Sequence, residues 1–318
     1  MQYLSYIFSY KQNAFTVCTV RSGKADCLNN FGIHGDIFMK IILFGSGQGG
    51  QMAARWLPSD CELLAFADNN SRKWGTFLNR TPIVNPEQIL SLSPDMVWIT
   101  VLNRDAACSI KTQLSDLGYT GPVQTLDRFR QVMDLRLAHL RLLAREIEER
   151  NLPGAVAELG VYKGVLAAEI NRLFPDRTLY LFDTFTGFSK NDVDTERNLA
   201  PHTRASAGDF GDTSIEQVRL RLPYPERAIF CKGYFPDTIP EDLPPLVFVS
   251  LDPDLYEPTL AGLRTFWPKL VPGGVILIHD YNSTQFEGAG KAVRTFCREQ
   301  HLMVLPLADL HGSAVLLK

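Results

Sequence analysis

Four residues with side chains that can bind a metal ion or move a proton stand close together near the C-terminus. The stretch LDPDLYEPT (251–259) carries Asp252 and Asp254, and the stretch IHDYNST (278–284) carries His279 and Asp280. Each stretch directly follows an apolar run with the length of a buried strand. Neighbouring carboxylates repel one another unless a cation or a proton relieves them. This pattern therefore indicates a metal site, an acid–base site or both.

The chemistry that suits these residues is activation of a hydroxyl group. A site with two or three oxygen ligands and open positions suits Mg²⁺. Such an ion would orient a hydroxyl group and lower its pKa. Asp254 is the preferred candidate for a catalytic base, and His279 fits either a metal ligand or a base. A purely structural alternative is that Asp252 and Asp254 cap the helix beginning near Pro258, with His279 in the core.

A second set of residues predicts a cofactor site. The strand AVAELGV (155–161) ends in Glu158-x-Gly160-x-x-x-Gly164, and the strand TLYLFD (178–183) ends in Asp183. Small residues allow a tight turn close to a ligand, and an acid at the second strand tip accepts hydrogen bonds from ribose hydroxyls. The form E-x-G-x-x-x-G lacks the three-glycine spacing of a dinucleotide fingerprint and favours S-adenosylmethionine. The alternative is that the glycines are ordinary turn residues.

These residues lie in a segment that predicts one doubly wound α/β domain. Five strand candidates alternate with segments that have the pattern of helices or loops. The five are AVAELGV, TLYLFD, AIFCKG, LVFVSLD and GGVILIHDY. Ligands of such folds gather at the carboxyl ends of the strands. The chemically suggestive residues all fall at those ends: Glu158, Gly160, Asp183, Gly233, Asp252 and Asp280.

The N-terminal half predicts a second Rossmann-like unit. After the strand MKIILF, the stretch GSGQGG (45–50) places Gly45, Gly47 and Gly50 in a G-x-G-x-x-G pattern, and Asp68 follows near the distance of a ribose contact. This unit is a candidate site for NAD or a nucleotide-sugar. The alternative is a degenerate Rossmann fold kept for packing or dimerisation. No Tyr-x-x-x-Lys pair or other hydride-transfer apparatus follows it.

The chain therefore divides into four predicted parts. Residues 1–38 are expected to be poorly ordered, with natural translation beginning at Met39. Residues 39–125 form the Rossmann-like nucleotide-binding domain. Residues 126–150 form a linker helix whose apolar stripe packs on the next domain or on a second copy of the chain. Residues 151–318 form the S-adenosylmethionine-dependent methyltransferase domain.

Composition excludes several classes of protein. The chain has 318 residues, 45% of them hydrophobic, which is enough for two domains with their own cores. The formal net charge of −3 and the lack of a basic block argue against nucleic acid as a partner. The six cysteines include no C-x-x-C pair, which favours reduced thiols. Without a signal peptide or an apolar run of about 20 residues, we expect a cytoplasmic protein, with homo-oligomers as one possibility.

Six ordered motifs carry a resemblance to a known family. The succession AELGVYKG, LFDTFTGF, FGDTS (210–214), KGYFPDT (232–238), SLDPDLYEPT and HDYNS resembles the macrocin O-methyltransferases, including the mycinamicin and novobiocin tailoring enzymes. Members of that family have a class I methyltransferase fold and methylate sugar hydroxyls with S-adenosylmethionine and magnesium. The match runs from about Val156 to the C-terminus.

The resemblance implies roles for individual residues. It implies metal ligands at Asp252 and Asp280 and a base at Asp254. It also implies a cofactor site with the following members: Glu158, Gly160, Val161, Tyr162, Gly164, Asp183, Asp212 and Tyr234. Two departures stand out, because His279 replaces a second acid and Tyr162-Lys163 replaces a tryptophan–arginine pair.

Three functions therefore compete. The first is an O-methyltransferase acting on a hydroxyl of a sugar or another small natural product, assisted by a metal. The second is an NAD- or nucleotide-sugar-binding enzyme or regulatory module run by the N-terminal domain. The third is a nucleotide-binding or assembly module with a decayed methyltransferase half. The complete acidic set argues for the first function.

Overall fold

The computed structural model describes residues 7–11, 14–21, 24–27 and 39–318, and the side chains from residue 39 onward except those of 130–132. The chain divides into two compact units, 1–39 and 40–318. In the first unit, β1 (Ile7–Lys11), β2 (Ala14–Arg21) and β3 (Lys24–Cys27) form an antiparallel sheet in that order. We predicted that residues 1–38 are poorly ordered. Most of these residues lie outside the described ranges, so this stays a prediction.

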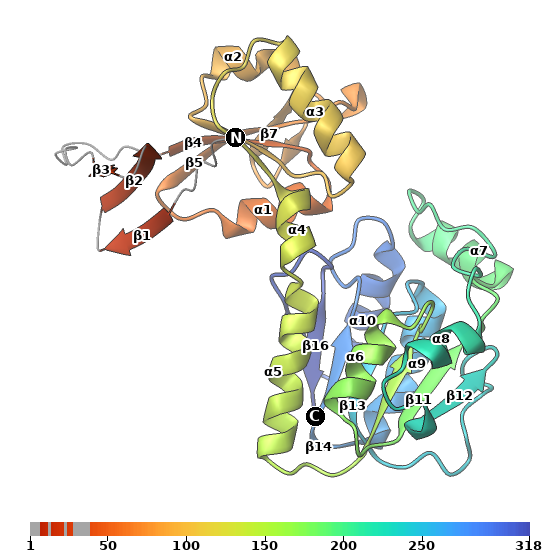
Figure 1. Ribbon diagram of the computed structural model, residues 1–318. Coiled ribbons are helices and arrows are strands. Elements are labelled where there is room, and N and C mark those ends of the chain that lie inside the picture. Colours follow the sequence, from red (N-terminus) through yellow and green to blue (C-terminus); the bar gives the residue numbers. More distant parts are fainter. Residues whose placement is uncertain (1–6, 12–13, 22–23, 28–38) are drawn as a thin grey trace. The chain divides into compact units, whose positions relative to one another are not determined.

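The first part of the second unit is built on a six-stranded sheet with the order β6-β7-β5-β4-β8-β9. Figure 1 labels β4, β5 and β7 of this sheet. Its strands are β4 (Met39–Phe44), β5 (Cys61–Ala67), β6 (Phe77–Leu78), β7 (Thr81–Val84), β8 (Met96–Ile99) and β9 (Val123–Thr125). Its helices are α1 (Gln48–Trp56), α2 (Ile89–Leu92) and α3 (Arg104–Asp116), with 3-10 turns at Ser71–Lys73 and Pro86–Gln88. The strand pairs β4–β8, β8–β9 and β5–β7 are parallel and β6–β7 is antiparallel. The predicted α/β class is thus confirmed for this part.

The second part is built on a seven-stranded sheet with the order β12-β11-β10-β13-β14-β16-β15. Its strands are β10 (Ala155–Leu159), β11 (Leu179–Asp183), β12 (Ala228–Lys232), β13 (Leu246–Leu251), β14 (Leu270–Ile278), β15 (Leu305–Pro306) and β16 (Ala314–Leu317). β10 to β14 are the five predicted strands and run parallel, whereas β16 runs antiparallel to both of its neighbours. The strand order reverses at β10 and β13, which is where ligands of doubly wound sheets bind.

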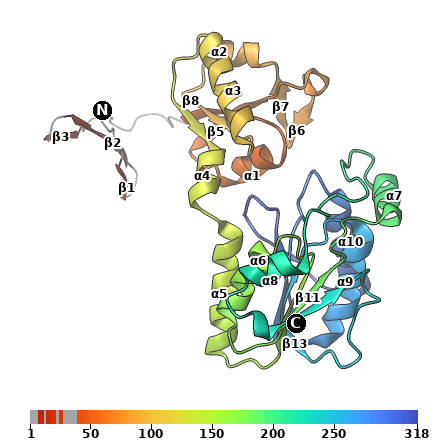
Figure 2. The ribbon, with the colours of Figure 1, turned by 45° about the vertical axis from the view of Figure 1, so that its right-hand side comes forward.

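Helices cover both faces of this second sheet. The helices of this part are α6 (Val165–Leu173), α7 (Lys190–Leu199), α8 (Ile215–Arg221), α9 (Tyr256–Lys269) and α10 (Glu287–Glu299), with a 3-10 turn at Pro225–Arg227. α7 contacts α9 and packs through Val193 against Leu255 and Phe286. Figure 2 shows α9 and α10 on one face and α6 on the other. Successive strand residues point to opposite faces, so Val156 packs with α6 whereas Ala157 packs with α9 and α10. Burial on both faces explains why the strands read as continuous apolar runs.

The segment predicted as one linker helix contains two helices, α4 (Leu126–Val132) and α5 (Leu135–Glu149). The helical path ends because Met133 and Asp134 adopt extended backbone, and the Asp134 carboxylate accepts a hydrogen bond from the Leu137 N–H at 2.9 Å. Asp134 is thus the N-cap of α5. Leu140 and Ile147 of α5 are buried in the same cluster as Val156, so α5 packs on the second sheet. Packing on the following domain is one of the two alternatives predicted for this apolar stripe.

No helix in residues 39–318, nor in the shorter described stretches before them, is long and apolar enough to cross a membrane.

Packing of α5 on the sheet predicts a large stability difference between two leucines of this helix. Leu140 is fully buried and Leu142 is 60% exposed. Leu140→Ala should therefore lower the free energy of unfolding by about 2–5 kcal/mol, because it removes buried methyl groups and leaves a cavity. Leu142→Ala is the matched control and should change it by about 0.5 kcal/mol or less. Urea unfolding measures both, and equal losses would contradict the packing of α5.

Candidate active site

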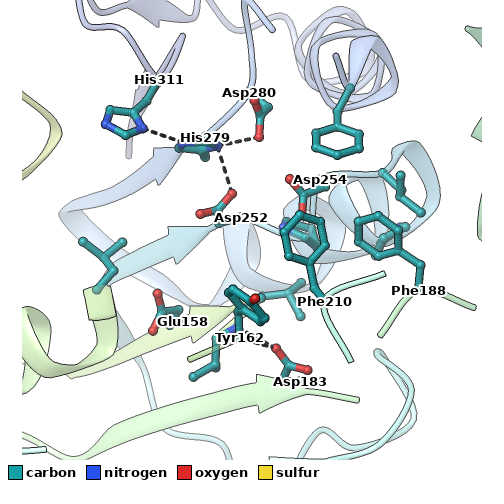
Figure 3. A pocket seen from close by; sticks show the side chains of 18 of the residues that line it. Glu158, Tyr162, Asp183, Phe188, Phe210, Asp252, Asp254, His279, Asp280 and His311 are labelled. Carbon is teal, nitrogen blue, oxygen red and sulfur yellow. Dashed lines mark hydrogen bonds and ion pairs between the residues drawn. The ribbon is translucent and has the colours of Figure 1, made fainter. Parts of the chain in front are cut away.

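A cavity of about 630 Å³ opens at the carboxyl ends of β10, β11, β13 and β14. Figure 3 shows acidic side chains converging on it from these strand ends. The predicted site residues that line it are Glu158, Gly160, Val161, Tyr162, Asp183, Tyr234, Asp252, Asp254, His279 and Asp280. The remaining two, Gly164 and Asp212, are not among its lining residues. The volume is typical of a site for a small organic ligand.

Asp183 at the end of β11 holds the glycine turn that follows β10. Its Oδ2 accepts hydrogen bonds from the backbone N–H groups of Val161 and Tyr162, each at 2.8 Å, and its Oδ1 accepts one from Phe185 at 2.7 Å. One carboxylate thus orders two loops at adjacent strand ends. The predicted contact with ribose hydroxyls remains a prediction, and any such contact would share the carboxylate with these backbone donors.

Glycine is required at two positions of the turn. The backbone of Gly160 lies in the left-handed region (φ 86°), and a Cβ there would lie 2.1 Å from the carbonyl oxygen of Asp252. Gly160 therefore lets β10 and β13 approach closely at the cavity. Gly164 is also left-handed (φ 71°), precedes the first residue of α6 and has no room for a Cβ beside Val218. The structure thus explains Gly164 by packing.

Asp212 and Tyr234 fix the loops around the cavity. Asp212 accepts a hydrogen bond from the Tyr162 hydroxyl at 2.8 Å and forms an ion pair with Lys163 at 2.6 Å. The Tyr234 hydroxyl donates to Asp192 at 2.8 Å. Asp212 thus braces the glycine turn from outside the cavity, and the cofactor contact that the family resemblance implies for it stays a prediction.

The acidic cluster is held together by one histidine. His279 Nδ1 lies 3.0 Å from Asp252 Oδ1 and 2.5 Å from Asp280 Oδ2, as Figure 3 shows. The structural alternative, in which Asp252 and Asp254 cap the helix, does not hold at α9. The N-cap is Leu255, and the first N–H of the helix, that of Tyr256, donates to Glu196 at 3.1 Å. The cluster is therefore arranged around the cavity and not around the helix end.

The charges of the cluster shift the pKa of each member. Burial opposes ionisation of Asp252, but the charges of His279 and Arg136 lower its pKa to about 2. Burial opposes a charge on His279 as well, yet Asp252 and Asp280 raise its pKa to about 10. Burial, followed by repulsion from Asp252 and Asp280, raises the pKa of Asp254 well above its usual value. Without another cation at the site, these shifts favour an imidazolium ion at His279 and favour the protonated form of Asp254 over its usual ionised form.

Backbone conformation marks two of the acids as special. Asp254 (φ 61°) and Asp280 (φ 57°) both occupy the left-handed region. Aspartate tolerates this region better than most residues, but the conformation still costs free energy relative to glycine. Strained residues of this kind concentrate at functional sites. Both side chains line the cavity, which agrees with a functional reason for the strain.

The donor set fits a divalent cation. Asp252, His279 and Asp280 each offer a ligand atom within 4.8 Å of the other two, and Asp254 lines the cavity beside them. Two carboxylates suit Mg²⁺, whereas an imidazole is more usual with transition metals. The imidazole of His279 therefore bears on which ion the site prefers.

Two residues of the cluster escape the sequence-based prediction. Arg136, in the first turn of α5, donates from Nη1 to Asp252 Oδ2 at 2.9 Å. Its sequence signal is its position on the buried stripe of the helix, four residues before Leu140. His311, from the loop before β16, lies with Nδ1 3.2 Å from His279 Nε2. No motif in the sequence marks His311.

Aromatic rings form one wall of the cavity. Phe210 packs against Tyr162 at 5.1 Å and against Phe188 at 5.2 Å between ring centroids, and all three residues line the cavity (Figure 3). Phe286 lies 6.4 Å from Phe210 in the same group. An apolar wall of this kind suits the ring of a cofactor or of an acceptor.

The glycine pattern of the first domain has a structural explanation. A Cβ at Gly50 would lie 1.9 Å from the carbonyl oxygen of Gly45, which is itself left-handed (φ 113°). Asp68 Oδ2 accepts from the Ser46 N–H at 3.1 Å and forms an ion pair with Lys73 at 2.9 Å. The predicted ribose acid is therefore engaged within the chain. At Gly47 a Cβ would meet nothing, so packing does not require that glycine.

Comparison with known proteins gives family matches over most of the chain. Residues 122–318 match the family model described as macrocin-O-methyltransferase (TylF). Residues 37–122 match the model described as C2185-like, N-terminal.

Individual relatives are similar to part of the chain. The chain is 31% identical over 156 residues to demethyldecarbamoylnovobiocin O-methyltransferase of Streptomyces niveus, covering 46% of this chain and 60% of that protein. It is 28% identical over 195 residues to 8-demethyl-8-(2,3-dimethoxy-alpha-L-rhamnosyl)-tetracenomycin-C 4'-O-methyltransferase of Streptomyces olivaceus, covering 57% and 71%. Among solved structures, the O-methyltransferase NovP is similar with 25% identity and a TM-score of 0.48, covering 57% of this chain and 79% of that one. The chain thus spans 60% of the length of the Streptomyces niveus relative.

The bonds of Asp183 predict that an amide cannot replace its carboxylate. In Asp183→Asn one oxygen becomes an NH₂ group that faces a backbone donor, so we expect the free energy of unfolding to fall by about 1–3 kcal/mol. Asp176→Asn, a change at an exposed position seven residues earlier, is the control and should have almost no effect. Urea unfolding of both variants tests this, and an unchanged Asp183→Asn protein would rule out the bracing role.

Proposed function

We propose that this chain, which belongs to the macrocin O-methyltransferase family, transfers a methyl group from S-adenosylmethionine to a hydroxyl group of a sugar-containing small molecule. The observation that carries the proposal is the meeting of two sets of residues at one cavity. The glycine turn after β10 and Asp183 after β11 lie on one side, and Asp252, Asp254, His279 and Asp280 lie on the other. The first set suits an adenosine cofactor and the second suits activation of a hydroxyl group.

The cofactor would lie along Glu158 to Tyr162 and reach Asp183. The N–H groups of Val161 and Tyr162 are already oriented by Asp183, so the turn is preorganised for a ligand. Tyr162 and Phe210 supply an aromatic surface beside it. A preorganised site spends less binding free energy on ordering its own loops.

Asp254 is our candidate for the base. In the transfer, the acceptor oxygen attacks the methyl carbon while the carbon–sulfur bond breaks, and the hydroxyl proton passes to Asp254. The products are a methyl ether and S-adenosylhomocysteine. Because the sulfonium already activates the methyl group, much of the acceleration comes from holding the two reactants in line, an effect worth up to roughly 7–11 kcal/mol.

Asp252 and Asp280, with His279 beside them, are the residues that would hold a divalent cation such as Mg²⁺. When bound, the ion would orient the acceptor hydroxyl, lower its pKa and favour the ionised form of Asp254. The protein's own contribution is to fix both carboxylates, through Arg136 on Asp252 and His279 on both.

The class of acceptor is inferred from the relatives and from the cavity. Two similar proteins have names that describe O-methylation of a demethyldecarbamoylnovobiocin and of a rhamnosyl-tetracenomycin. The cavity combines carboxylates with an aromatic wall, which suits a molecule that has both hydroxyl groups and apolar rings. For the N-terminal domain, the engaged Asp68 adds no support to an NAD or nucleotide-sugar site, and we propose none.

Loss of a carboxylate from the acidic cluster should reduce methyl transfer strongly and should change cofactor binding little. In Asp252→Asn and Asp280→Asn we expect methyl transfer to a glycosylated acceptor to fall by about 100-fold or more, because the hydroxyl loses its activation. The Kd for S-adenosylmethionine should stay within about threefold of the value for the unchanged protein, because the residues proposed to contact the cofactor are kept. Calorimetry measures binding, and mass spectrometry measures the methylated product with and without Mg²⁺.

Asp176→Asn serves again as the control and should bind and transfer like the unchanged protein. Full activity in either cluster variant would show that the carboxylates are not part of the chemistry. Failure of the unchanged protein to bind S-adenosylmethionine would overturn the proposed function itself.

A further inference from the structure

Two buried side chains of opposite charge lie at one end of the cavity, beside the glycine turn. Glu158 is the fourth residue of β10 and is only 2% exposed, and Arg136 of α5 is 9% exposed. Both line the cavity. The charge of each acts on the other, since Arg136 opposes the rise in the pKa of Glu158 that burial causes.

Each of these side chains keeps a polar atom without a hydrogen-bond partner. The atoms are Nε of Arg136 and Oε2 of Glu158. Buried polar atoms in folded proteins are nearly always paired, and leaving one unpaired costs free energy. An unpaired donor and an unpaired acceptor in neighbouring charged groups therefore need an explanation.

The remaining contacts of Arg136 leave one edge of its guanidinium group largely unused. Nη1 donates to Asp252 Oδ2 at 2.9 Å, and Nη2 has only a long contact of 3.5 Å with the Ser250 hydroxyl. A guanidinium group has five N–H donors in a planar fork and can bind a carboxylate through two of them at once. The edge formed by Nε and Nη2 is therefore suited to a second carboxylate.

The position of Arg136 in its helix also calls for a functional reason. It is the second residue of α5, and the N-terminus of a helix carries partial positive charge that disfavours a cation. Burial of the cation adds to this cost unless anions surround it. Asp252 supplies one such anion, and the unpaired Nε leaves a donor that a second anion could use.

We propose that Arg136 and Glu158 together bind the amino-acid end of S-adenosylmethionine, with its carboxylate on Arg136 and its ammonium group on Glu158. The inference rests on the proposed function and adds Arg136 as a cofactor-binding residue. A zwitterion fits this pair because it brings one charge of each sign and leaves the net charge of the buried site unchanged. Arg136 would then lie between the cofactor carboxylate and Asp252.

Cofactors with and without the carboxylate test the inference by calorimetry. The two ligands are S-adenosylmethionine and decarboxylated S-adenosylmethionine. In Arg136→Gln we expect the first to bind about 10- to 100-fold more weakly, as for loss of one charge-assisted pair. The second should change by less than about threefold, because it has no carboxylate to lose. Arg136→Lys keeps the positive charge but not the planar fork. Its loss of affinity for S-adenosylmethionine should therefore lie between those of the unchanged protein and Arg136→Gln.

Arg145→Gln is the matched control, since Arg145 lies on the same helix and pairs with Glu149 at the surface. It should bind both cofactors like the unchanged protein. Equal weakening of both cofactors in Arg136→Gln, or no weakening, would overturn the inference. If Arg136→Gln unfolds, the split between the two ligands in Arg136→Lys decides. The proposed function fails separately, if the unchanged protein binds no S-adenosylmethionine.

Discussion

The arrangement of the active-site region depends on neutralising three carboxylates that lie at the ends of two adjacent strands. Asp252, Asp254 and Asp280 repel one another in a partly dry cavity. His279 bridges two of them, and Arg136 pairs with Asp252 from the opposite side. Breaking such a network by removing one partner is strongly destabilising. Removing either cation would therefore leave a buried carboxylate uncompensated beside the cavity.

This network joins parts of the chain that are far apart in the sequence. Arg136 comes from α5, Asp252 from the end of β13, His279 from the end of β14, and His311 from the loop before β16. The helix that links the two Rossmann-like parts is thus also a wall of the cavity. Its apolar residues, such as Leu140, anchor it to the sheet, and this anchoring holds Arg136 in place.

The two glycine turns of the chain share a local design. In each part, an acid at the end of the second strand accepts a hydrogen bond from a backbone N–H of the turn after the first strand: Asp68 from Ser46, and Asp183 from Val161. In the first part Lys73 also pairs with the acid. In the second part the turn lines a cavity that contains further carboxylates. A shared motif therefore does not imply a shared chemistry, since neighbouring strand ends decide what a turn can bind.

Local sequence patterns predict the parallel strands β10 to β14 and place Glu158, Asp183, Asp252 and Asp280 at their ends. Apolar runs followed by polar residues are local signals, and parallel strands bring their carboxyl ends to one edge. The break between α4 and α5 is local as well, since Asp134 caps α5 through the Leu137 N–H, but it interrupts an apolar stripe that predicts one continuous helix. The roles of Asp212, Arg136 and His311 emerge only in the folded chain. Asp212 braces the glycine turn, and Arg136 and His311 join the acids, through contacts between residues more than 30 positions apart, which no local pattern encodes.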